Sequence, residues 1–273
     1  MKKLIILIRA SIFSLAATSF LFSQNWEIQA EGLATRWQAI DAVDSNIAAA
    51  IAWNKSPTGG GCIFRTLNGG KSWHEIPWIE GYPVLIDISI TDSSEIWVAT
   101  NYSICHTSDS GKSWEVQYYP DTTDIMMSYI EMFDSLNGVA AADAPLEGLP
   151  VQILKTNDGG KNWLSQNQNY FRGGGLSNYW RPIDFISPDI GYAAFSYFNV
   201  PLDTVFIQKT TDGGLTWNPT SLCVKHSYTI KFFNEDIGIA TTVANYSNPV
   251  YRTLNGGKTW DYFPLDFGGG WSN

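Results

Sequence analysis

The stretch Lys155-Thr-Asn-Asp-Gly-Gly-Lys-Asn-Trp163 decides the fold, because its pattern recurs five times along the 273-residue chain. The shared form is Thr-x-Asp/Asn-x-Gly-x-Ser/Thr/Asn-Trp. Successive copies end in tryptophans that are 41, 49, 54 and 43 residues apart, a period typical of solenoids, propellers and other repeat arrays. The five copies are Arg65–Trp73, His106–Trp114, Lys155–Trp163, Lys209–Trp217 and Arg252–Trp260.

The chemistry of this motif is that of a hairpin turn. An Asp or Asn side chain bonds its own backbone two residues on, and glycine accepts the positive φ that tight turns need. Strand-like residues precede each copy, and the Trp opens another short strand, where it packs on its neighbour. The residues that we expect to be structural are Asn68, Gly70, Trp73, Asp109, Gly111, Trp114, Asp158, Gly160, Trp163, Asp212, Gly214, Trp217, Asn255, Gly257 and Trp260.

A second hairpin precedes each motif. Ile130–Ala141, Ile183–Ala194 and Ile230–Ala240 share an Ile-led strand, a polar turn and a Gly-led strand. Each unit therefore holds four short strands, and four-stranded antiparallel units of this length form propeller blades. The sequence predicts an all-β chain, a single propeller over residues 25–273, with blades at about 35–80, 81–121, 125–169, 178–222 and 226–267.

The five motifs resemble Asp-boxes, also called bacterial neuraminidase repeats. Sialidases, xyloglucanases, sortilin-type receptors and photosystem II assembly factors carry such repeats, and the Asp-Ile-Gly-Tyr-Ala-Ala segment at 189–194 is most similar to the last group. The resemblance covers residues 37–263. It implies a propeller in which the boxes lie on the rim, away from any active site, and it leaves the function open.

The number of blades is an open question. Five units are complete, whereas propellers with these repeats commonly have six or seven blades. The segment Asn25–Gln29 resembles Ser113–Gln117, the strand after a box, and Phe267–Asn273 resembles Phe171–Asn178, which leads into another blade. We expect an incomplete six- or seven-bladed ring. The competing arrangement is a closed ring of five blades.

The first 24 residues read as a secretory signal, because Lys2 and Lys3 precede a long apolar stretch. Its removal takes away three of the 17 basic residues and leaves a net charge of −12. Such an acidic surface repels phosphate backbones, so a nucleic-acid partner is not expected. We expect a secreted, periplasmic or cell-surface protein without a stable membrane anchor after cleavage.

Catalytic and metal motifs are missing from the sequence, so no catalytic residue, metal or cofactor is expected. The chain lacks His-Glu-x-x-His, Cys-x-x-Cys and Gly-x-Ser-x-Gly. Sialidases use three arginines that converge on a carboxylate. Beyond the signal, the chain has Arg36, Arg65, Arg172, Arg181 and Arg252, and Arg65 and Arg252 begin boxes.

Two groups of residues are candidate ligand contacts. A mostly acidic column, Asp41, Asp87, Glu131, Asp184 and Lys231, follows an Ile in each predicted innermost strand. Its side chains either bond backbone donors between blades or line the channel for a cation or a basic peptide. The second group is Tyr179, Trp180 and Arg181, in a predicted loop where aromatic side chains can stack on sugars or anchor proteins.

These observations favour a secreted, non-catalytic propeller that binds a protein or a glycan. The alternative is a glycoside hydrolase of the sialidase type, which requires carboxylates at a suitable separation.

Overall fold

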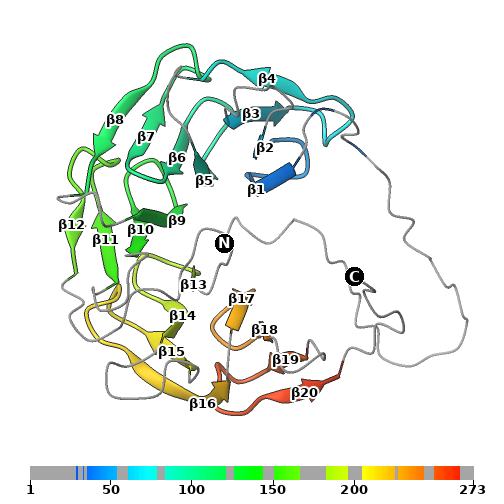
Figure 1. The fold of residues 1–273 in the computed structure, drawn as a ribbon, viewed down its shortest axis with the longest axis vertical. Coiled ribbons are helices and arrows are strands. Elements are labelled where there is room, and N and C mark those ends of the chain that lie inside the picture. Colours follow the sequence, from blue (N-terminus) through cyan, green and yellow to red (C-terminus); the bar gives the residue numbers. More distant parts are fainter. Residues whose placement is uncertain are drawn as a thin grey trace, which may run out of the picture.

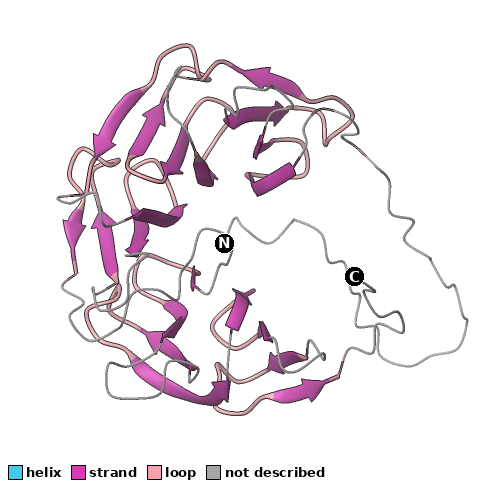
Figure 2. Ribbon diagram, in the orientation of Figure 1, coloured by secondary structure: helices cyan, strands magenta, loops and turns pink. Residues whose placement is uncertain are grey.

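A computed structural model gives the fold, and it describes residues 29, 33, 36–53, 61–78, 84–120, 126–143, 151–166, 183–195, 205–224, 227–242 and 249–264. Within these ranges the chain forms strands and turns, with no helix (Figure 2). The all-β prediction is therefore confirmed. No helix in the described ranges is long and apolar enough to cross a membrane.

The strands form five antiparallel sheets of four, which we call blades 1 to 5. Blade 1 contains β1 (Arg36–Ala42), β2 (Ala48–Trp53), β3 (Gly61–Thr66) and β4 (His74–Ile76). Blade 2 contains β5 (Leu85–Ile90), β6 (Ile96–Thr100), β7 (Ile104–Thr107) and β8 (Glu115–Tyr118). Blade 3 contains β9 (Met126–Met132), β10 (Gly138–Asp143), β11 (Gln152–Thr156) and β12 (Leu164–Ser165). Blade 4 contains β13 (Ile183–Phe185), β14 (Gly191–Phe195), β15 (Val205–Thr210) and β16 (Asn218–Val224). Blade 5 contains β17 (Ser227–Phe232), β18 (Gly238–Thr242), β19 (Val250–Thr253) and β20 (Asp261–Phe263).

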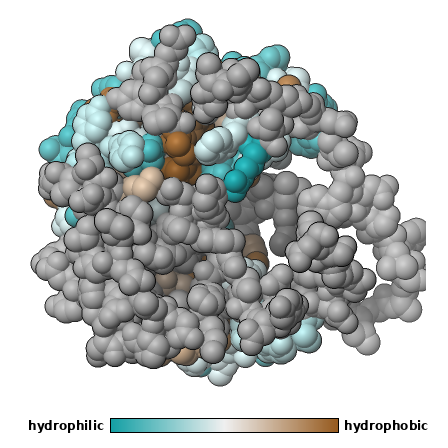
Figure 3. Space-filling model, viewed as in Figure 1, coloured by the Kyte–Doolittle hydropathy of each residue, from teal (hydrophilic) through white to brown (hydrophobic). Residues whose placement is uncertain are grey.

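Each blade is a meander, with its strands paired in chain order from the inside of the molecule outward (Figure 1). The blades follow one another around an arc, with β1 and β17 near its two ends (Figure 1). On the face shown in Figure 3, the largest hydrophobic patch of described residues lies toward the inner side, near β5. The inner strands are rich in Ala, Ile and Val, which suits strands that are covered on both faces.

Four apolar cores hold consecutive blades together. Ile51 and Ile63 of blade 1 pack with Ile88 of blade 2, and Trp97 of blade 2 packs with Ile130 of blade 3. Corresponding clusters join blade 3 to blade 4 and blade 4 to blade 5. Burial of apolar side chains between the sheets therefore stabilises the fold, by about 25 cal/mol for each Å² of apolar area that is removed from water.

No comparable core joins blade 5 to blade 1 among the residues that the structure describes. The remaining apolar cluster contains Ala52, Cys62 and Phe64 with Trp73, all from blade 1. In Figure 1 the two ends of the arc stand apart. The competing prediction of a ring in which blade 5 packs directly on blade 1 does not describe this structure.

Candidate functional site

The five Thr–Trp turns, residues 66–73, 107–114, 156–163, 210–217 and 253–260, share one hydrogen-bond network. In the third turn, the Thr156 hydroxyl donates to Asp158 Oδ1 at 2.9 Å and accepts the Gly160 N–H at 2.9 Å. Asp158 also accepts the backbone N–H of Asn162 at 3.0 Å. The other four turns repeat these three bonds. The Asp and Asn side chains are therefore engaged within their own turns.

The acidic members of these turns have lowered pKa values. In Asp109, hydrogen bonds from the Ser113 hydroxyl and backbone and from the Thr107 hydroxyl lower the carboxyl pKa from 3.8 to about 2. Side-chain and backbone hydrogen bonds from Asn162 lower the pKa of Asp158 in the same way. The ionised carboxylate is thus the form that the folded turn binds.

Asp109→Asn should leave stability at pH 7 nearly unchanged and make the protein less sensitive to acid. Asn68 and Asn255 occupy the same place in turns 1 and 5, with the amide donating to Ser72 Oγ at 2.9 Å and to Thr259 Oγ1 at 2.8 Å. A carboxyl with a depressed folded-state pKa contributes stability above its unfolded pKa of about 3.8, and this is lost as the pH falls towards about 2. Urea midpoints of both proteins at pH 7 and pH 2.5 test this, and an equal loss in both would contradict it.

The structure places the predicted acidic column in the joints between blades. Asp41 Oδ2 accepts the backbone N–H of Ile90 at 2.8 Å, and Asp184 Oδ2 accepts that of Phe232 at 2.6 Å. Asp87 Oδ2 accepts the N–H of Ile130 at 3.1 Å. Each carboxylate therefore binds the first strand of the following blade, the first of the two roles considered for the column.

One position of the column needs correction. Asp41 pairs with Ala49 close to the turn between β1 and β2. In blade 2 the equivalent residue, close to the turn between β5 and β6, is Ser89, which pairs with Trp97. Asp87 lies two residues earlier and pairs with Ala99. The sequence Ile-Asp-Ile-Ser-Ile at 86–90 alternates between Ile and a polar residue. The Ile40-Asp41 pair of blade 1 can therefore be aligned with either Ile86-Asp87 or Ile88-Ser89, and the sequence alone does not distinguish the two registers.

With this register, the same backbone N–H is bound at all four joints. It belongs to the last residue of the innermost strand, and it donates to a side-chain oxygen of the preceding blade. The donor and acceptor pairs are Ile90 to Asp41, Met132 to Ser89, Phe185 to Tyr129 and Phe232 to Asp184. In blade 1 the equivalent N–H, that of Ala42, bonds the Oδ1 of Asp41 in its own strand at 2.8 Å.

The remaining column members, Glu131 and Lys231, differ from their neighbours. Tyr129 takes the acceptor role that Glu131 would have, and burial raises the pKa of this Tyr well above its usual value. Lys231 forms an ion pair with Asp184 at 2.8 Å, and its pKa is raised by the charges of Asp184, Glu131 and Asp41 against the effect of burial. The column is thus a set of joint contacts with one cation at its end.

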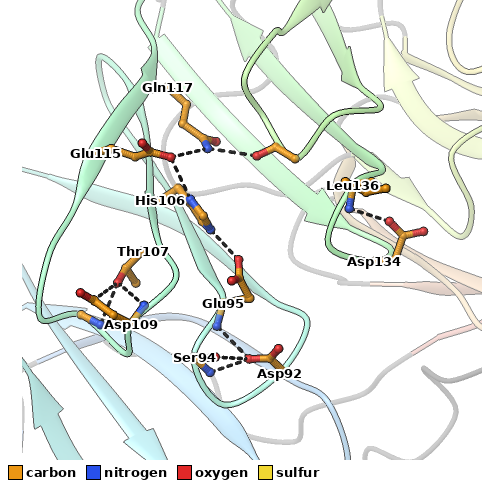
Figure 4. Close-up of polar contacts among 12 residues, drawn as sticks. Asp92, Ser94, Glu95, His106, Thr107, Asp109, Glu115, Gln117, Asp134 and Leu136 are labelled. Carbon is orange, nitrogen blue, oxygen red and sulfur yellow. Dashed lines mark hydrogen bonds and ion pairs between the residues drawn. The ribbon is translucent and has the colours of Figure 1, made fainter.

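A polar relay crosses blade 2 near its outer edge (Figure 4). His106 lies between Glu95 Oε2 at 2.7 Å and Glu115 Oε1 at 3.1 Å, and its ring stacks on Trp97. Gln117 then donates to Glu115 at 3.0 Å and to the Gly159 carbonyl of blade 3 at 3.0 Å. The relay connects the outer strand of blade 2 to the third turn.

The face of blade 1 that points away from blade 2 is a candidate binding surface. We call it the open face and define it by Trp37, Ile40, Ala50, Phe64 and Trp73. It holds a pocket of about 250 Å³, whose lining is Gln29, Trp37, Gln38, Ala39, Ile40, Ala50 and Trp73. The ring of Trp37 makes an edge contact with Phe64 and lies 6.2 Å from Trp73.

The open face is exposed at Ile40 and Trp37, whereas Ala50 and Phe64 beside them are only 2% and 5% exposed. Ile40 is 60% exposed, although it holds the position that the preceding blade covers in every other unit. Its equivalents lie in the innermost strands of the other blades, near the turn to the second strand. They are Ile88, Ile130, Ile183 and Ile230, with exposures of 3%, 1%, 3% and 2%. An exposed apolar patch of this kind marks an interaction surface more often than an isolated exposed side chain does.

Gln29 covers the outer end of the open face. Its amide donates to the Gly69 carbonyl of the first turn at 3.3 Å, and a Cβ on Gly70 would lie 1.9 Å from its Oε1. Gln117 makes the same pair of contacts with Gly159 and Gly160 in the joint between blades 2 and 3. Gln29 therefore occupies the place of an outer-strand residue from a blade that would precede blade 1.

Other predicted site residues have different outcomes. Tyr179, Trp180 and Arg181 lie outside the described residues, as does the signal segment. Arg65 donates to the Ser93 carbonyl, and Arg252 pairs with Asp261 at 3.1 Å. In the described part of the chain, no group of three His, Cys, Asp or Glu side chains is arranged to hold a metal ion.

Comparisons with solved structures identify the architecture. YCF48 bound to D1 peptide matches with a TM-score of 0.55 and 15% identity, over 86% of this chain and 82% of that one. The GH74 enzyme of Niastella koreensis matches with a TM-score of 0.61 and 14% identity, over 84% of this chain and 38% of the enzyme. A nidogen–laminin complex matches at 0.55 and 10%, over 83% and 79%. The fold is a β-propeller. No protein-family model matches the propeller sequence, and no curated protein matches it.

The incomplete ring expected from the sequence implies an exposed face at the end of the arc, but the sequence did not single out the residues of that face in this propeller. Trp37 and Ile40 look like ordinary strand residues, and only the missing neighbour exposes them. A signal for Gln29 was present, since Trp26-Glu-Ile-Gln29 matches Trp114-Glu-Val-Gln117. Its meaning depended on whether the ring is open, because in a closed ring of five blades this segment would add an outer strand or lie across the seam.

Proposed function

We propose that this chain is a non-catalytic β-propeller that binds a protein partner through the open face of blade 1. The observation that carries the proposal is the exposed Ile40, in a position where four equivalent side chains are buried under another blade. Trp37 and Trp73 beside it line an apolar pocket. Tryptophan side chains in such a pocket are typical of energetic centres in protein interfaces.

The size and polarity of the pocket favour a protein partner over a glycan. Sites for small ligands usually measure about 300–1,000 Å³ and carry several convergent polar groups. The pocket of about 250 Å³ has Gln29 and Gln38 as its polar side chains, with Ala, Ile and Trp around them. One or two apolar side chains of a partner would fill it. Two of the matching structures, YCF48 bound to D1 peptide and a complex of nidogen with laminin, contain a peptide or protein partner.

The alternative function is glycoside hydrolysis, and the likeness to GH74 enzymes favours it. Retaining and inverting glycosidases need two carboxyl groups flanking the substrate, about 5–10 Å apart. Three of the four carboxylates in the column, Asp41, Asp87 and Asp184, accept backbone N–H groups between blades. Using them in catalysis would cost the joints their hydrogen bonds, which supports the binding function.

We also propose export as the location of this activity. The support is the sequence itself, with Lys2 and Lys3 before an apolar stretch and an acidic remainder. Fusing residues 1–40 to alkaline phosphatase lacking its own signal tests export, because that enzyme is active only outside the bacterial cytoplasm. Activity equal to a fusion without residues 1–24 would refute the proposal.

Selection of displayed random peptides on the full chain tests the binding function. Peptides that bind the wild type should lose at least tenfold in affinity with Ile40→Lys, which puts a charge into the apolar pocket. Leu136→Lys is the matched control, because Leu136 is an exposed apolar residue in a turn of blade 3. Xyloglucan and a fluorogenic sialoside are assayed in parallel. Turnover of either substrate would favour the hydrolase, and peptide binding that is insensitive to Ile40→Lys would remove the open face as the site.

A further inference from the structure

We infer that the open face of blade 1 receives a three-stranded antiparallel β-element of a partner polypeptide. The element would pack on this face as a preceding blade does, on the inner side of the outer position that Gln29 fills. This inference rests on the proposed protein-binding function and specifies the partner's shape. The joints inside the chain supply the template, since each of the four has an inner, a middle and an outer contact. The open face already has the outer one.

The outer contact is the one that Gln29 provides. Gln29 and Gln117 each donate from the side-chain amide to the first glycine carbonyl of a Thr–Trp turn, at 3.3 and 3.0 Å. In each case the Oε1 atom packs so closely on the second glycine of the turn that a Cβ added to this glycine would lie only 1.9 Å from it. Gln117 lies in β8, the outermost strand of blade 2. An element docking on blade 1 therefore meets an outer position that is already filled.

Among the described residues, the middle contact is apolar and is open at Ile40, whereas Ala50 is only 2% exposed. In the joint between blades 2 and 3, Trp97 and Ala99 of the earlier blade pack with Ile130 and Ala140 of the later one. On the open face, Ile40 and Ala50 hold the positions of Ile130 and Ala140, since each pair is directly cross-strand. Ile40 is 60% exposed. The docking element must supply side chains like those of Trp97 and Ala99.

The inner contact specifies an acceptor on the partner. The N–H of Ile90, Met132, Phe185 and Phe232 each donates to an oxygen of the preceding blade. The corresponding Ala42 N–H bonds only the Asp41 side chain of its own strand among the contacts of the described residues. The first strand of the partner should therefore carry Asp, Ser or Tyr at this position, the three types that the chain itself uses.

A cation on the partner's third strand is the second chemical requirement. Arg65 of blade 1 donates to the Ser93 carbonyl in the first turn of blade 2, and Lys155 of blade 3 pairs with Asp189 in blade 4 at 2.7 Å. The matching turn of blade 1 contains Asp44, Ser45 and Asn46. Asp44 is ionised under ordinary conditions, because backbone hydrogen bonds from Asn46 and Ile47 lower its pKa. An Arg or Lys from the partner would meet an acidic turn.

Blade 5 does not meet these requirements, either in the same chain or in a second copy. Lys231 stands at the acceptor position, and a lysine ammonium has donors only. Blade 5 also has its own outer strand, β20, which would compete with Gln29 for one place. Arg252 is engaged with Asp261 and lies against the Phe263 ring. A partner that lacks an outer strand satisfies the geometry, whereas a complete blade does not.

The probe for this inference is a meander taken from the chain itself. Residues 84–107 contain β5, β6 and β7 without an outer strand, and they include Trp97, Ala99 and the acceptor Ser89. This segment is joined after Asn273 through a long Gly-Ser linker. We expect the thermal midpoint to rise by about 5 °C or more, because the added segment would bury Ile40 and Trp37, which are 60% and 39% exposed.

Three comparisons make the result specific. The rise should vanish when Ile40→Lys is present in blade 1, and it should shrink when the added segment carries Ser89→Ala. It should also be smaller for an added segment 84–118, because β8 then competes with Gln29. No rise with 84–107, an equal rise with 84–118, or a rise unaffected by Ile40→Lys would overturn the inference. Dimerisation of the unmodified chain that Ile40→Lys abolishes would overturn it as well, by making a second copy the occupant.

These outcomes are separate from those of the peptide selection. A stabilising added segment with no peptide ligand would retain the docking geometry and reject the proposed function. Peptides that bind through Ile40, together with an added segment that has no effect, would retain the function and reject the three-stranded partner.

Discussion

Ile130→Ala should lower the free energy of unfolding by about 2–5 kcal/mol, whereas Ile40→Ala should change it by less than about 0.5 kcal/mol. The two residues hold the same position in blades 3 and 1, in direct register with Ala140 and Ala50. Ile130 is 1% exposed in the core between blades 2 and 3, so its truncation leaves a cavity. Ile40 is 60% exposed, so water fills the space that its side chain leaves.

Chemical denaturation of the two single variants measures the difference directly. The pair is informative because the substitution, the cross-strand alanine and the distance from the turn are the same in both variants. A loss for Ile40→Ala as large as that for Ile130→Ala would mean that another surface covers blade 1 in solution, and the open face would no longer describe the free protein.

Gly160→Ser should cost at least about 2 kcal/mol, and Gly159→Ser should cost much less. Gly160 has a φ of +87°, which costs a residue with a Cβ about 1–2 kcal/mol. Its Cβ would also stand 1.9 Å from Gln117 Oε1, so the Gln117 amide must move aside and lose its hydrogen bond to the Gly159 carbonyl. Gly159 has a φ of +78°, but the protein already carries a serine at the equivalent place, Ser110, with a φ of 66°.

The serine in turn 2 shows why the first glycine is replaceable. Ser110 Oγ donates to the Ser93 carbonyl at 3.3 Å, and Ser135 presents the equivalent carbonyl to position 159. Urea unfolding of both variants, with Gln117→Ala added to Gly160→Ser, separates backbone strain from the clash. Partial recovery in the double variant is expected, and equal losses for the two single variants would refute this account of the turn.

The sequence was sufficient to predict the architecture because the decisive contacts are local. Thr156, Asp158 and Gly160 close their turn through bonds that span four residues or fewer, so the pattern of residue types carries the geometry. The four-stranded units follow, since each hairpin joins strands that are neighbours in the chain. Local chemistry of this kind is visible in a single sequence.

The candidate site was less predictable because it depends on contacts between blades. Asp87 and Ser89 differ in role through a two-residue register that the alternating sequence does not distinguish. Among the described residues, Ile40 differs from the isoleucines at the equivalent positions in having no blade over it, which is a property of the arc and not of the residue. The acidic column had two interpretations, and distances to Ile90 and Phe232 were needed to assign Asp41 and Asp184 to the joints.

The open arc makes stability vary with position along the chain. Blade 3 is held by apolar cores on both faces, whereas blades 1 and 5 are each held on one. In a row of units coupled only to their neighbours, an end unit can open by losing one interface, but a central unit must lose two. Unfolding of this protein should therefore begin as fraying at the two ends of the arc and move inward, with blade 3 the last to open. A partner that covers blade 1 would convert an end unit into an internal one and suppress fraying on that side.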